Sequence, residues 1–545
     1  MGLAPSLHVD TFTRDSLPPA DQWPTFLLAP GYPDRLNCAS VLLSGAAEDR
    51  PCLLTPAGEA WTYGDLRRHS DRVAGYLVGR GLVPGNRVLL RAPNNPWLVA
   101  CWFGVLRMGG VAVTTMPLLR PVELQTIHEI ARIDHSLVDD RFVDDLEAAD
   151  IGSFTTFSAL AALPAAEFST VDTSADDVAL LAFTSGTTGR PKATMHFHRD
   201  VLAIADTFSS HVLRPVPEDV FTGSPPLGFT FGLGGLVVFP MRVGASTLLL
   251  EKGTPDVLVQ VLESMRPTVL FTAPTAYRAL LSTGGDFSSL RRCVSAGEPL
   301  PLSTWEGWHE ATGQRIIDGI GATELLHIFI SAADGDIRPG ATGRPVPGYE
   351  ACVLDDAGLP VPDGEIGRLA VRGPTGCRYL ADARQSSYVR NGWNLTGDTY
   401  IRDADGYFWY QARSDDMIIS AGFNIAGPEV EMALLRHPDV LECGVVGRPD
   451  PSRTMSVHAY VVLRPDVTAT PERAEELRAF TRTVIAPYKA PRTIEFLPAL
   501  PRTSTGKVQR YVLRDLSAGG GGGAADAADA ADGADLADRG TPGSP

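Results

Sequence analysis

The stretch Val178–Lys192 reads VALLAFTSGTTGRPK and decides how the rest of the chain is interpreted. Its first six residues, Val178–Phe183, have the length and apolar character of a buried strand. A loop of hydroxyl residues and glycine follows and ends on a lysine. Gly186 and Gly189 let backbone N–H groups approach an anion closely, and Lys192 adds a positive charge. The hydroxyl donors of this loop are Thr184, Ser185, Thr187 and Thr188.

Apolar residues recur at helical spacing beyond the loop, so a helix is predicted to follow it. They are Val201, Leu202, Ala205, Phe208 and Val212. A strand, a glycine-rich loop and a helix in this order favour a bound polyphosphate, with ATP as the expected ligand. On composition alone the loop would be an ordinary surface loop. It is also not a P-loop of the G-x-x-x-x-G-K-[ST] type, because Ala193 follows Lys192.

The order T-S-G-T-T-G-x-P-K at Thr184–Lys192 resembles the phosphate loop of the adenylate-forming enzymes, which include acyl-CoA synthetases, luciferases and peptide-synthetase adenylation domains. The resemblance covers roughly residues 10–515. It implies an α/β fold with a large N-terminal domain, made of two wound α/β subdomains and a β-rich subdomain, and a small mobile C-terminal α+β domain. The expected domains are 1–414 for ATP and acid binding, 415–517 for the mobile domain, and 518–545 as a disordered Gly/Ala/Asp tail.

The pattern of segments agrees with that organisation. Strands alternate with helices to about residue 330, which indicates a wound α/β architecture. Short strands separated by turns fill Ile337–Tyr410 and predict a β-rich subdomain. Beyond Arg413 we expect a small α+β domain, with a last helix capped by Thr470 and Pro471 at its first position. Its other elements are a helix over Pro428–Arg436, strands over Val440–Val446 and Val457–Leu463, and the capped helix up to Val484.

Composition limits the possible partners. The net charge of −17 argues against nucleic acid or an anionic membrane surface as the main partner. Seven scattered cysteines, with no secretory signal before them, predict reduced thiols in the cytoplasm, and no run is long enough to span a membrane. Basic residues dominate Leu477–Arg514, which forms either a solvated face or a phosphate-binding surface. His196 and His198 lack nearby ligands for a metal and are expected to pack beside the loop. A monomer or homodimer is expected.

Further motifs of the adenylate-forming enzymes occur in order along the chain. In the resemblance Ala296, Gly297 and Glu298 pack against the purine and Asp318 meets the adenine edge. Thr323 contacts the α-phosphate, and Glu324 holds Mg²⁺, for which a carboxylate is a suitable ligand. Asp398 and Arg413 bind the ribose. The implied ATP-binding set is Thr184, Ser185, Gly186, Thr187, Thr188, Gly189, Lys192, Ala296, Gly297, Glu298, Asp318, Gly319, Ile320, Gly321, Thr323, Asp398, Arg413 and Lys507.

The end of the chain resembles the mobile domain of the family. Lys507, in PRTSTGK, corresponds to the catalytic lysine, and the implied catalytic set is Lys507, Thr184, Lys192 and Glu324. Asp415 corresponds to the hinge. The implied CoA-binding residues are Ser420, Gly422, Phe423, Lys489 and Arg492. One loop departs from the family pattern: Arg453–Ser456 replaces a glycine-containing sequence, and His458 stands where a lysine is common. CoA docking is therefore in doubt, and adenylation is not.

Several segments resemble benzoate–CoA ligases, and within that group 2-aminobenzoate (anthranilate) ligases. By position, the acid-binding residues would be Phe229, Thr230, Phe231, Ala296, Gly321, Leu326, His327 and Ile328. Two phenylalanine rings with branched aliphatic residues make a flat apolar slot suited to an aryl ring. Thr230 and His327 could hydrogen-bond a ring amino or hydroxyl group. Taken singly, each of these residues would instead be read as core.

The sequence thus predicts an ATP-dependent ligase that activates 2-aminobenzoate or a related benzoate as the acyl-AMP and then forms the CoA thioester. Its expected cofactors are ATP, Mg²⁺ and coenzyme A, and its substrate an aryl carboxylate. One alternative passes the acyl group to a carrier-protein phosphopantetheine. Another is a binding or regulatory protein without turnover, which predicts a damaged motif, and the sequence contains none.

Overall fold

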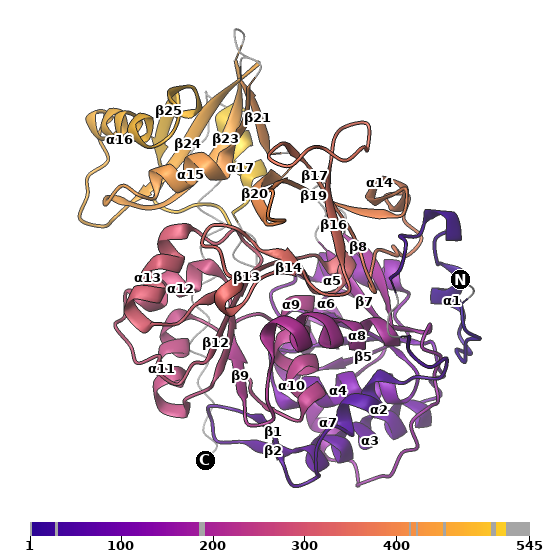
Figure 1. The fold of residues 1–545 in the computed structure, drawn as a ribbon. Helices are drawn as coiled ribbons and strands as arrows, with labels where there is room; N and C mark the ends of the chain where they lie inside the picture. The colour runs from indigo at the N-terminus through magenta and orange to yellow at the C-terminus, as the bar shows by residue number, and fades with distance from the viewer. Residues whose placement is uncertain are drawn as a thin grey trace. The chain divides into compact units, whose positions relative to one another are not determined.

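The computed structural model describes residues 3–27, 31–184, 191–413, 416–420, 423–450, 454–502 and 508–518. The chain divides into two compact units, Met1–Asp415 and Asp416–Pro545, which are described separately (Figure 1). Within the described ranges, no helix is both long enough and apolar enough to cross a membrane. The α/β fold class predicted from the sequence, with a large first domain and a small second one, is confirmed.

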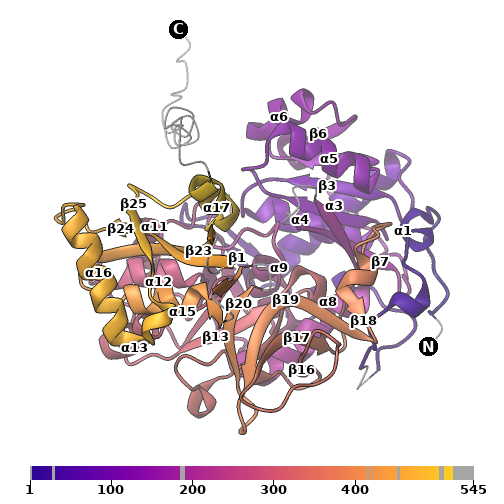
Figure 2. The ribbon, with the colours of Figure 1, turned by 90° about the horizontal axis from the view of Figure 1, so that it is seen from above.

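A six-stranded sheet of the first unit has helices on both faces, as Figure 2 shows for β3. Val88 and Leu90 belong to the core on the side of α3(Tyr63–Gly79) and α4(Pro96–Arg107), whereas Leu89 packs with residues of α5(Pro121–Ala131) on the other side. Burial on both faces explains why its central strands read as continuous apolar runs. The strand order is β6(Phe154–Thr156), β5(His135–Val138), β3(Arg87–Arg91), β4(Val111–Thr115), β7(Val178–Thr184) and β8(Lys192–Phe197), and the helices are α3(Tyr63–Gly79), α4(Pro96–Arg107), α5(Pro121–Ala131), α6(Val143–Ala148) and α7(Phe157–Ala161).

A nine-stranded sheet forms the second layer of the first unit. Its central strands are parallel and its ends are antiparallel. The strand order is β15(Arg344–Pro345), β14(Ile328–Ser331), β13(Ile316–Gly321), β12(Arg292–Ala296), β11(Val269–Thr272), β9(Val220–Gly223), β10(Ser246–Leu248), β1(Pro51–Leu54) and β2(Ala60–Thr62). Three helices lie together along it (Figure 1): α11(Pro255–Met265), α12(Pro274–Leu281) and α13(Leu302–Thr312). The remaining helical segments around both sheets are α1(Phe12–Asp15), η1(Ala20–Gln22), α2(Cys38–Leu43), η2(Asp140–Phe142), α8(His198–Ile204), η3(Ala205–Leu213), α9(Thr230–Leu233), η4(Gly234–Val238), α10(Phe239–Val243), η5(Thr323–Leu325) and η6(Asp334–Asp336).

An antiparallel sheet completes the first unit, as the β-rich texture predicts, and a fourth sheet forms the centre of the second unit. The antiparallel sheet contains β16(Glu350–Leu354), β17(Ile366–Arg372), β19(Trp393–Arg402), β18(Val389–Arg390) and β20(Phe408–Arg413), with α14(Gln385–Tyr388) beside it. The second unit contains β22(Phe423–Ala426), β21(Met417–Ser420), β24(Thr454–Leu463), β23(Val440–Asp450), β25(Thr493–Phe496), α15(Gly427–Leu434), α16(Pro471–Val484), η7(Pro487–Lys489) and α17(Arg510–Ala518). The Thr470 side chain accepts a hydrogen bond from the Arg473 N–H, so the predicted cap is present.

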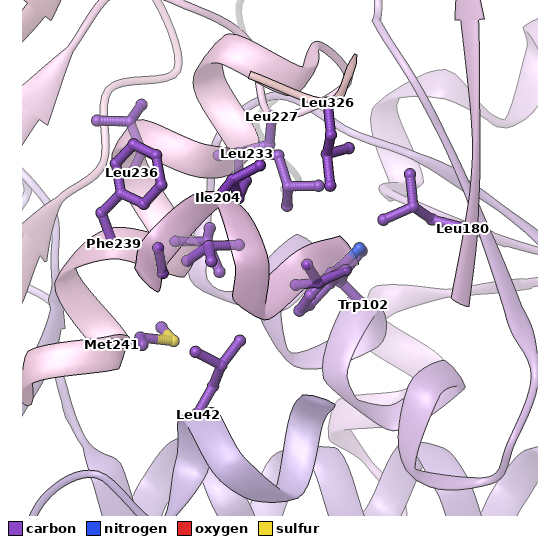
Figure 3. Close-up of a cluster of buried hydrophobic side chains, with 14 of the residues drawn as sticks. Leu42, Trp102, Leu180, Ile204, Leu227, Leu233, Leu236, Phe239, Met241 and Leu326 are labelled. Atoms are coloured by element: carbon purple, nitrogen blue, oxygen red, sulfur yellow. The ribbon is translucent and has the colours of Figure 1, made fainter. Parts of the chain in front are cut away.

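The largest hydrophobic core contains residues of helices that pack against the six-stranded and nine-stranded sheets. It also contains Leu325 and Leu326, in the turn before β14. Figure 3 shows Leu326, Leu227 and Leu233 at the top of the view and Trp102 and Leu42 below them, all in one cluster. This core therefore extends from the framework to residues that the sequence assigns to substrate binding.

The predicted helix is present over residues 198–213, but a strand separates it from the glycine-rich loop. Lys192–Phe197 forms β8, which pairs antiparallel with β7, so the loop joins the two strands of a hairpin. The helix begins only at His198 and changes from α to π geometry at Ala205. The expected helix N-terminus thus does not follow the loop directly, because Lys192–Phe197 first pair with β7.

Candidate active site

The hairpin places both ends of the predicted phosphate loop at one edge of the six-stranded sheet. Thr184 ends β7 and pairs with Lys192, the first residue of β8. The Thr184 Oγ1 atom is buried and has no hydrogen-bond partner among the described residues. Ser185, Gly186, Thr187, Thr188 and Gly189 lie outside the described residues. An unpartnered hydroxyl next to a lysine is a pair of donors suited to an anion.

His196 links this hairpin to the turn that carries Glu324. Its Nε2–H donates to the Thr323 carbonyl oxygen at 2.8 Å. Burial lowers the pKa of His196 to about 4, so the ring is neutral near pH 7. His198 lies elsewhere, with its Nδ1 3.1 Å from the Cys38 Sγ atom. The H-x-H pair therefore acts in packing, and within the described ranges no three His, Cys, Asp or Glu side chains gather as a metal site would require.

Glu324 and Lys192 meet at Tyr379. The Lys192 Nζ atom lies 3.1 Å from Glu324 Oε1, and both side chains are largely buried. The Tyr379 hydroxyl donates to the same Oε1 at 2.5 Å and accepts a hydrogen bond from Lys192. Burial and the Glu324 carboxylate raise the pKa of Tyr379 well above its usual value, so the phenol keeps its proton. The result is a compact charged cluster beside the phosphate loop.

One carboxylate at such a place suits Mg²⁺. Proteins bind this ion through one or two carboxylates together with water and the phosphates of the substrate. Both contacts that the described residues make to Glu324 fall on Oε1, which leaves Oε2 for a ligand. The residues present therefore fit the ion that the sequence predicts.

The expected purine residues lie at the ends of two neighbouring parallel strands, and the expected ribose residues pair across two antiparallel strands. Ala296, at the end of β12, pairs with Gly319 on β13, next to Asp318. The Asp318 Oδ1 atom is buried without a hydrogen-bond partner among the described residues, and burial raises the pKa of this carboxyl to about 7. Asp398 and Arg413 pair across β19 and β20, with Nη1 3.2 Å from Oδ1. The other residues predicted to bind the nucleotide follow Ala296 and Gly319 in the sequence: Gly297, Glu298, Ile320, Gly321 and Thr323.

Among the residues predicted for the acid, His327 is 2% exposed and has the Phe231 ring beside it. Burial has the largest effect on its pKa and lowers it to about 3, whereas a polar contact from the Phe231 backbone raises this pKa. Neither ring nitrogen meets the full geometry of a hydrogen bond with a described residue. The ring is neutral near pH 7 and has one donor and one acceptor nitrogen, of which at most one meets the Phe231 backbone. Four phenylalanine rings lie with centroids 4.6–6.4 Å from the imidazole: Phe208, Phe231, Phe239 and Phe271. Phe229 and Thr230 are half-buried nearby in sequence, and Leu326 and Ile328 are buried.

The backbone around His327 is unusual. Leu326 has a φ of +70°, a conformation that a branched residue adopts only where its surroundings impose it. Two π-helical segments flank the ring: η3 supplies Phe208, and η4 begins at Gly234. A Cβ atom added to Gly234 would come within 2.3 Å of His327 Cδ2, so only glycine leaves room for the imidazole. Strain and π-helical turns are frequent at functional sites.

In the second unit the expected residues are placed as follows. Ser420 is buried at the end of β21, and Phe423 begins β22. Lys489 Nζ forms an ion pair with Glu429 Oε1 at 2.6 Å, whereas Arg492 is exposed. Several cations of Leu477–Arg514 are likewise paired with acids of the same unit: Arg478 with Glu475, Arg502 with Glu442, Arg510 with Glu431 and Arg514 with Asp416. Asp415, Gly422 and Lys507 lie outside the described residues, as do 519–545 of the predicted tail.

Sequence reasoning missed Tyr379 and three of the rings around His327. Phe208, Phe239 and Phe271 come from separate elements, and each reads as an ordinary core residue. Tyr379 follows β17 in a segment whose only signal is a run of buried residues. Its position depends on pairing with β8: Met195 N–H donates to the Arg378 carbonyl, and Leu380 N–H donates to the Ala193 carbonyl.

Comparison with known proteins agrees with these motifs. The model of the AMP-binding enzyme family matches residues 44–379, and that of the AMP-binding enzyme C-terminal domain matches residues 429–507. Benzoate–CoA ligase of Thauera aromatica is 32% identical over 509 residues, which cover 88% of this chain and 96% of that protein. 3-Hydroxybenzoate–CoA ligase of an Aromatoleum species is 33% identical, with coverage of 88% and 95%.

Solved structures give the same result. The anthranilate CoA ligase AuaEII in complex with anthranoyl-AMP superposes with a TM-score of 0.85 at 34% identity and covers 89% of this chain and 98% of its own. A benzoate CoA ligase from Burkholderia xenovorans LB400 superposes with a TM-score of 0.82 at 33% identity, covering 88% and 100%. Sequence motifs, fold and family models converge, and the chain belongs to the AMP-binding enzyme family.

Proposed function

We propose that this chain is an ATP-dependent aryl acid–CoA ligase that takes 2-aminobenzoate or a closely related benzoate. Support for the reaction class comes from family membership and from the similarity to aryl acid–CoA ligases over nearly the whole chain. Support for the substrate comes from one observation above all: a neutral imidazole buried among aromatic rings, with no side-chain hydrogen-bond partner among the described residues.

An aryl carboxylate with a polar ring substituent fits these surroundings. The aromatic rings offer apolar contact to the flat face of the substrate. A buried polar atom without a partner is costly, and a substrate amino group that donates a hydrogen bond to the acceptor nitrogen of His327 would remove the cost at that nitrogen on binding. Unsubstituted benzoate leaves this nitrogen unsatisfied, so the site should discriminate in favour of the substituted ring.

The chain's own residues have distinct tasks in acid activation. A carboxylate is a poor electrophile, and its oxygen must attack the α-phosphate of ATP and expel pyrophosphate to form the acyl-AMP. Negative charge then gathers on the phosphate oxygens, where catalysis is mainly positioning and electrostatic stabilisation. Lys192 and the Thr184 hydroxyl hold phosphate oxygens, and Lys507 supplies a positive charge to the reacting carboxylate. Mg²⁺, when bound at Glu324, neutralises charge on the polyphosphate.

The second step passes the acyl group to the thiol of CoA and releases AMP. We assign residues 1–414 to ATP and acid binding and 415–517 to a mobile domain that turns about Asp415. This turn would replace Lys507 by the face around Gly422 when CoA is to react. Ser420, Phe423, Lys489 and Arg492 complete the proposed CoA side.

A panel of benzoates tests the proposal. Purified protein with ATP and Mg²⁺ is given benzoate or its 2-amino, 2-hydroxy, 3-hydroxy and 4-hydroxy derivatives, with and without CoA. Pyrophosphate, AMP and the aryl thioester are measured. We expect pyrophosphate release to be fastest with 2-aminobenzoate, and the thioester to form only with CoA. Failure with every aryl acid would refute the proposal. Turnover with a phosphopantetheinyl carrier protein but not with CoA would assign the chain to carrier loading instead.

A further inference from the structure

The Tyr379 hydroxyl is the centre of the cluster that contains Glu324 and Lys192. It donates to Glu324 Oε1 at 2.5 Å and accepts from the Lys192 ammonium group. The ammonium nitrogen also lies 3.1 Å from the same oxygen and 4.4 Å from the centroid of the Tyr379 ring. One phenol therefore contacts both a carboxylate and an ammonium group within a buried space.

The backbone fixes the position of Tyr379. Tyr379 forms an isolated antiparallel bridge with Thr194 of β8, which lies two residues after Lys192. Its N–H donates to the side-chain oxygen of Gln385 at 2.9 Å, and its side chain is fully buried. Thr375 lies on the same segment as Tyr379. Its hydroxyl donates to the Leu325 carbonyl at 2.7 Å and so joins this segment to the turn that carries Glu324. The Tyr379 hydroxyl is thus carried by a rigid frame rather than by a free loop.

The cluster leaves one donor and one acceptor for a ligand. A lysine ammonium group has three N–H bonds, and two of them point to Tyr379 and Glu324. Both protein contacts to the carboxylate fall on Oε1, which leaves Oε2. A metal–phosphate pair presents the complementary groups, a cation and an anionic oxygen side by side.

We propose that Tyr379 is a positioning residue of the nucleotide site: its hydroxyl holds Glu324 so that Oε2 faces the divalent cation and holds Lys192 so that its remaining N–H faces a phosphate. This inference rests on the proposed function, because it needs a metal-bound polyphosphate at this place. Without the hydroxyl, Glu324 and Lys192 would form only a direct pair, and the carboxylate would be held less firmly for the cation.

Tyr388 provides a matched control. Its ring lies 5.7 Å from that of Tyr379, and Lys192 Nζ lies 5.4 Å from its centroid. Its hydroxyl is buried but has no hydrogen-bond partner among the described residues. Tyr379→Phe and Tyr388→Phe therefore remove the same atom from neighbouring rings, and only the first removes a contact to Glu324.

The test is the binding of ATP measured by calorimetry, once with Mg²⁺ and once with a chelator. The dissociation constant with the chelator, divided by the dissociation constant with Mg²⁺, reports how much the metal contributes to affinity. We expect Tyr379→Phe to reduce this ratio by about tenfold, as loss of one charge-assisted hydrogen bond would. Tyr388→Phe should keep the ratio within twofold of wild type, and Glu324→Gln sets the largest possible loss. Circular dichroism and melting temperature verify the fold of each variant.

If Tyr379 had only a structural role, Tyr379→Phe would weaken ATP binding equally with Mg²⁺ and with the chelator. The ratio would then stay unchanged, and this result would overturn the inference. An equal loss in Tyr388→Phe would also overturn it, because the aromatic wall and not the hydroxyl would then matter. A wild-type protein that binds no ATP at all would instead refute the proposed function, so the two failures are distinguishable.

Discussion

Replacing His327 by leucine should stabilise the protein and remove its selectivity for the substituted ring at once. Leucine is close to histidine in size and carries no polar atom. In the wild type His327 is 2% exposed, and neither ring nitrogen has a side-chain hydrogen-bond partner among the described residues. We therefore expect one substitution to raise stability and to lower substrate selectivity. Such a trade-off is common where binding needs a residue that destabilises the fold.

The magnitude follows from burial and from protonation. An unsatisfied buried polar group costs about 1–3 kcal/mol, so His327→Leu should raise the free energy of unfolding by about 2 kcal/mol at pH 7. The pKa of His327 falls from 6.5 to about 3 on folding. Below pH 6.5 the unfolded chain therefore binds a proton that the folded chain does not, and wild-type stability falls by about 1.4 kcal/mol per pH unit. At pH 5 the advantage of the leucine variant should be about 2 kcal/mol larger than at pH 7.

Urea unfolding at pH 5 and pH 7 measures the first effect, and kcat/KM for 2-aminobenzoate and benzoate measures the second. The ratio of the two kcat/KM values should fall about tenfold in His327→Leu, as expected for one lost hydrogen bond. His198→Leu is the control: it removes another buried neutral histidine, paired with Cys38, and should leave the ratio unchanged. A leucine variant that is less stable than wild type and equally selective would refute the reasoning.

Three further predictions follow from named contacts. Gly234→Ala should reduce kcat/KM for the aryl acid more than tenfold while sparing the KM for ATP, because its Cβ would meet His327 within 2.3 Å; steady-state kinetics with each substrate decide this. Asp200→Ala should lower the free energy of unfolding by about 3 kcal/mol or more, because it leaves the fully buried Arg378 guanidinium without its partner at 2.7 Å; thermal unfolding would show it, and a loss below 1 kcal/mol would contradict it. Lys507→Ala should abolish acyl-AMP formation but largely spare thioester formation from preformed acyl-AMP, and equal loss of both would contradict its role.

Short-range patterns in the sequence correctly predicted the elements that depend mainly on neighbouring residues. The continuous apolar run of β7 and the Thr470 cap of α16 are present where they were expected. β8 could not be predicted in the same way. Its strand state depends on hydrogen bonds to β7 and to residues near 379, which are far away in sequence. The sequence shows only a loop and a helical pattern beyond it, so the hairpin was missed.

The candidate site shows the same division. Short, ordered patterns in the sequence made Lys192, Glu324 and His327 candidates. Their shared surroundings come from tertiary packing: Tyr379 reaches Glu324 from 55 residues away, and the aromatic rings around His327 come from different elements. That the imidazole has no side-chain partner among the described residues is a property of the packed core, and residue type does not reveal it.

Exchange of labelled pyrophosphate into ATP tests the adenylation step without CoA, and so examines the central claim most directly. The protein is incubated with ATP, Mg²⁺ and labelled pyrophosphate, with and without 2-aminobenzoate. The account predicts exchange that depends on the aryl acid and disappears in Lys507→Ala. Exchange that is absent with every aryl acid, or equally fast without one, would contradict it.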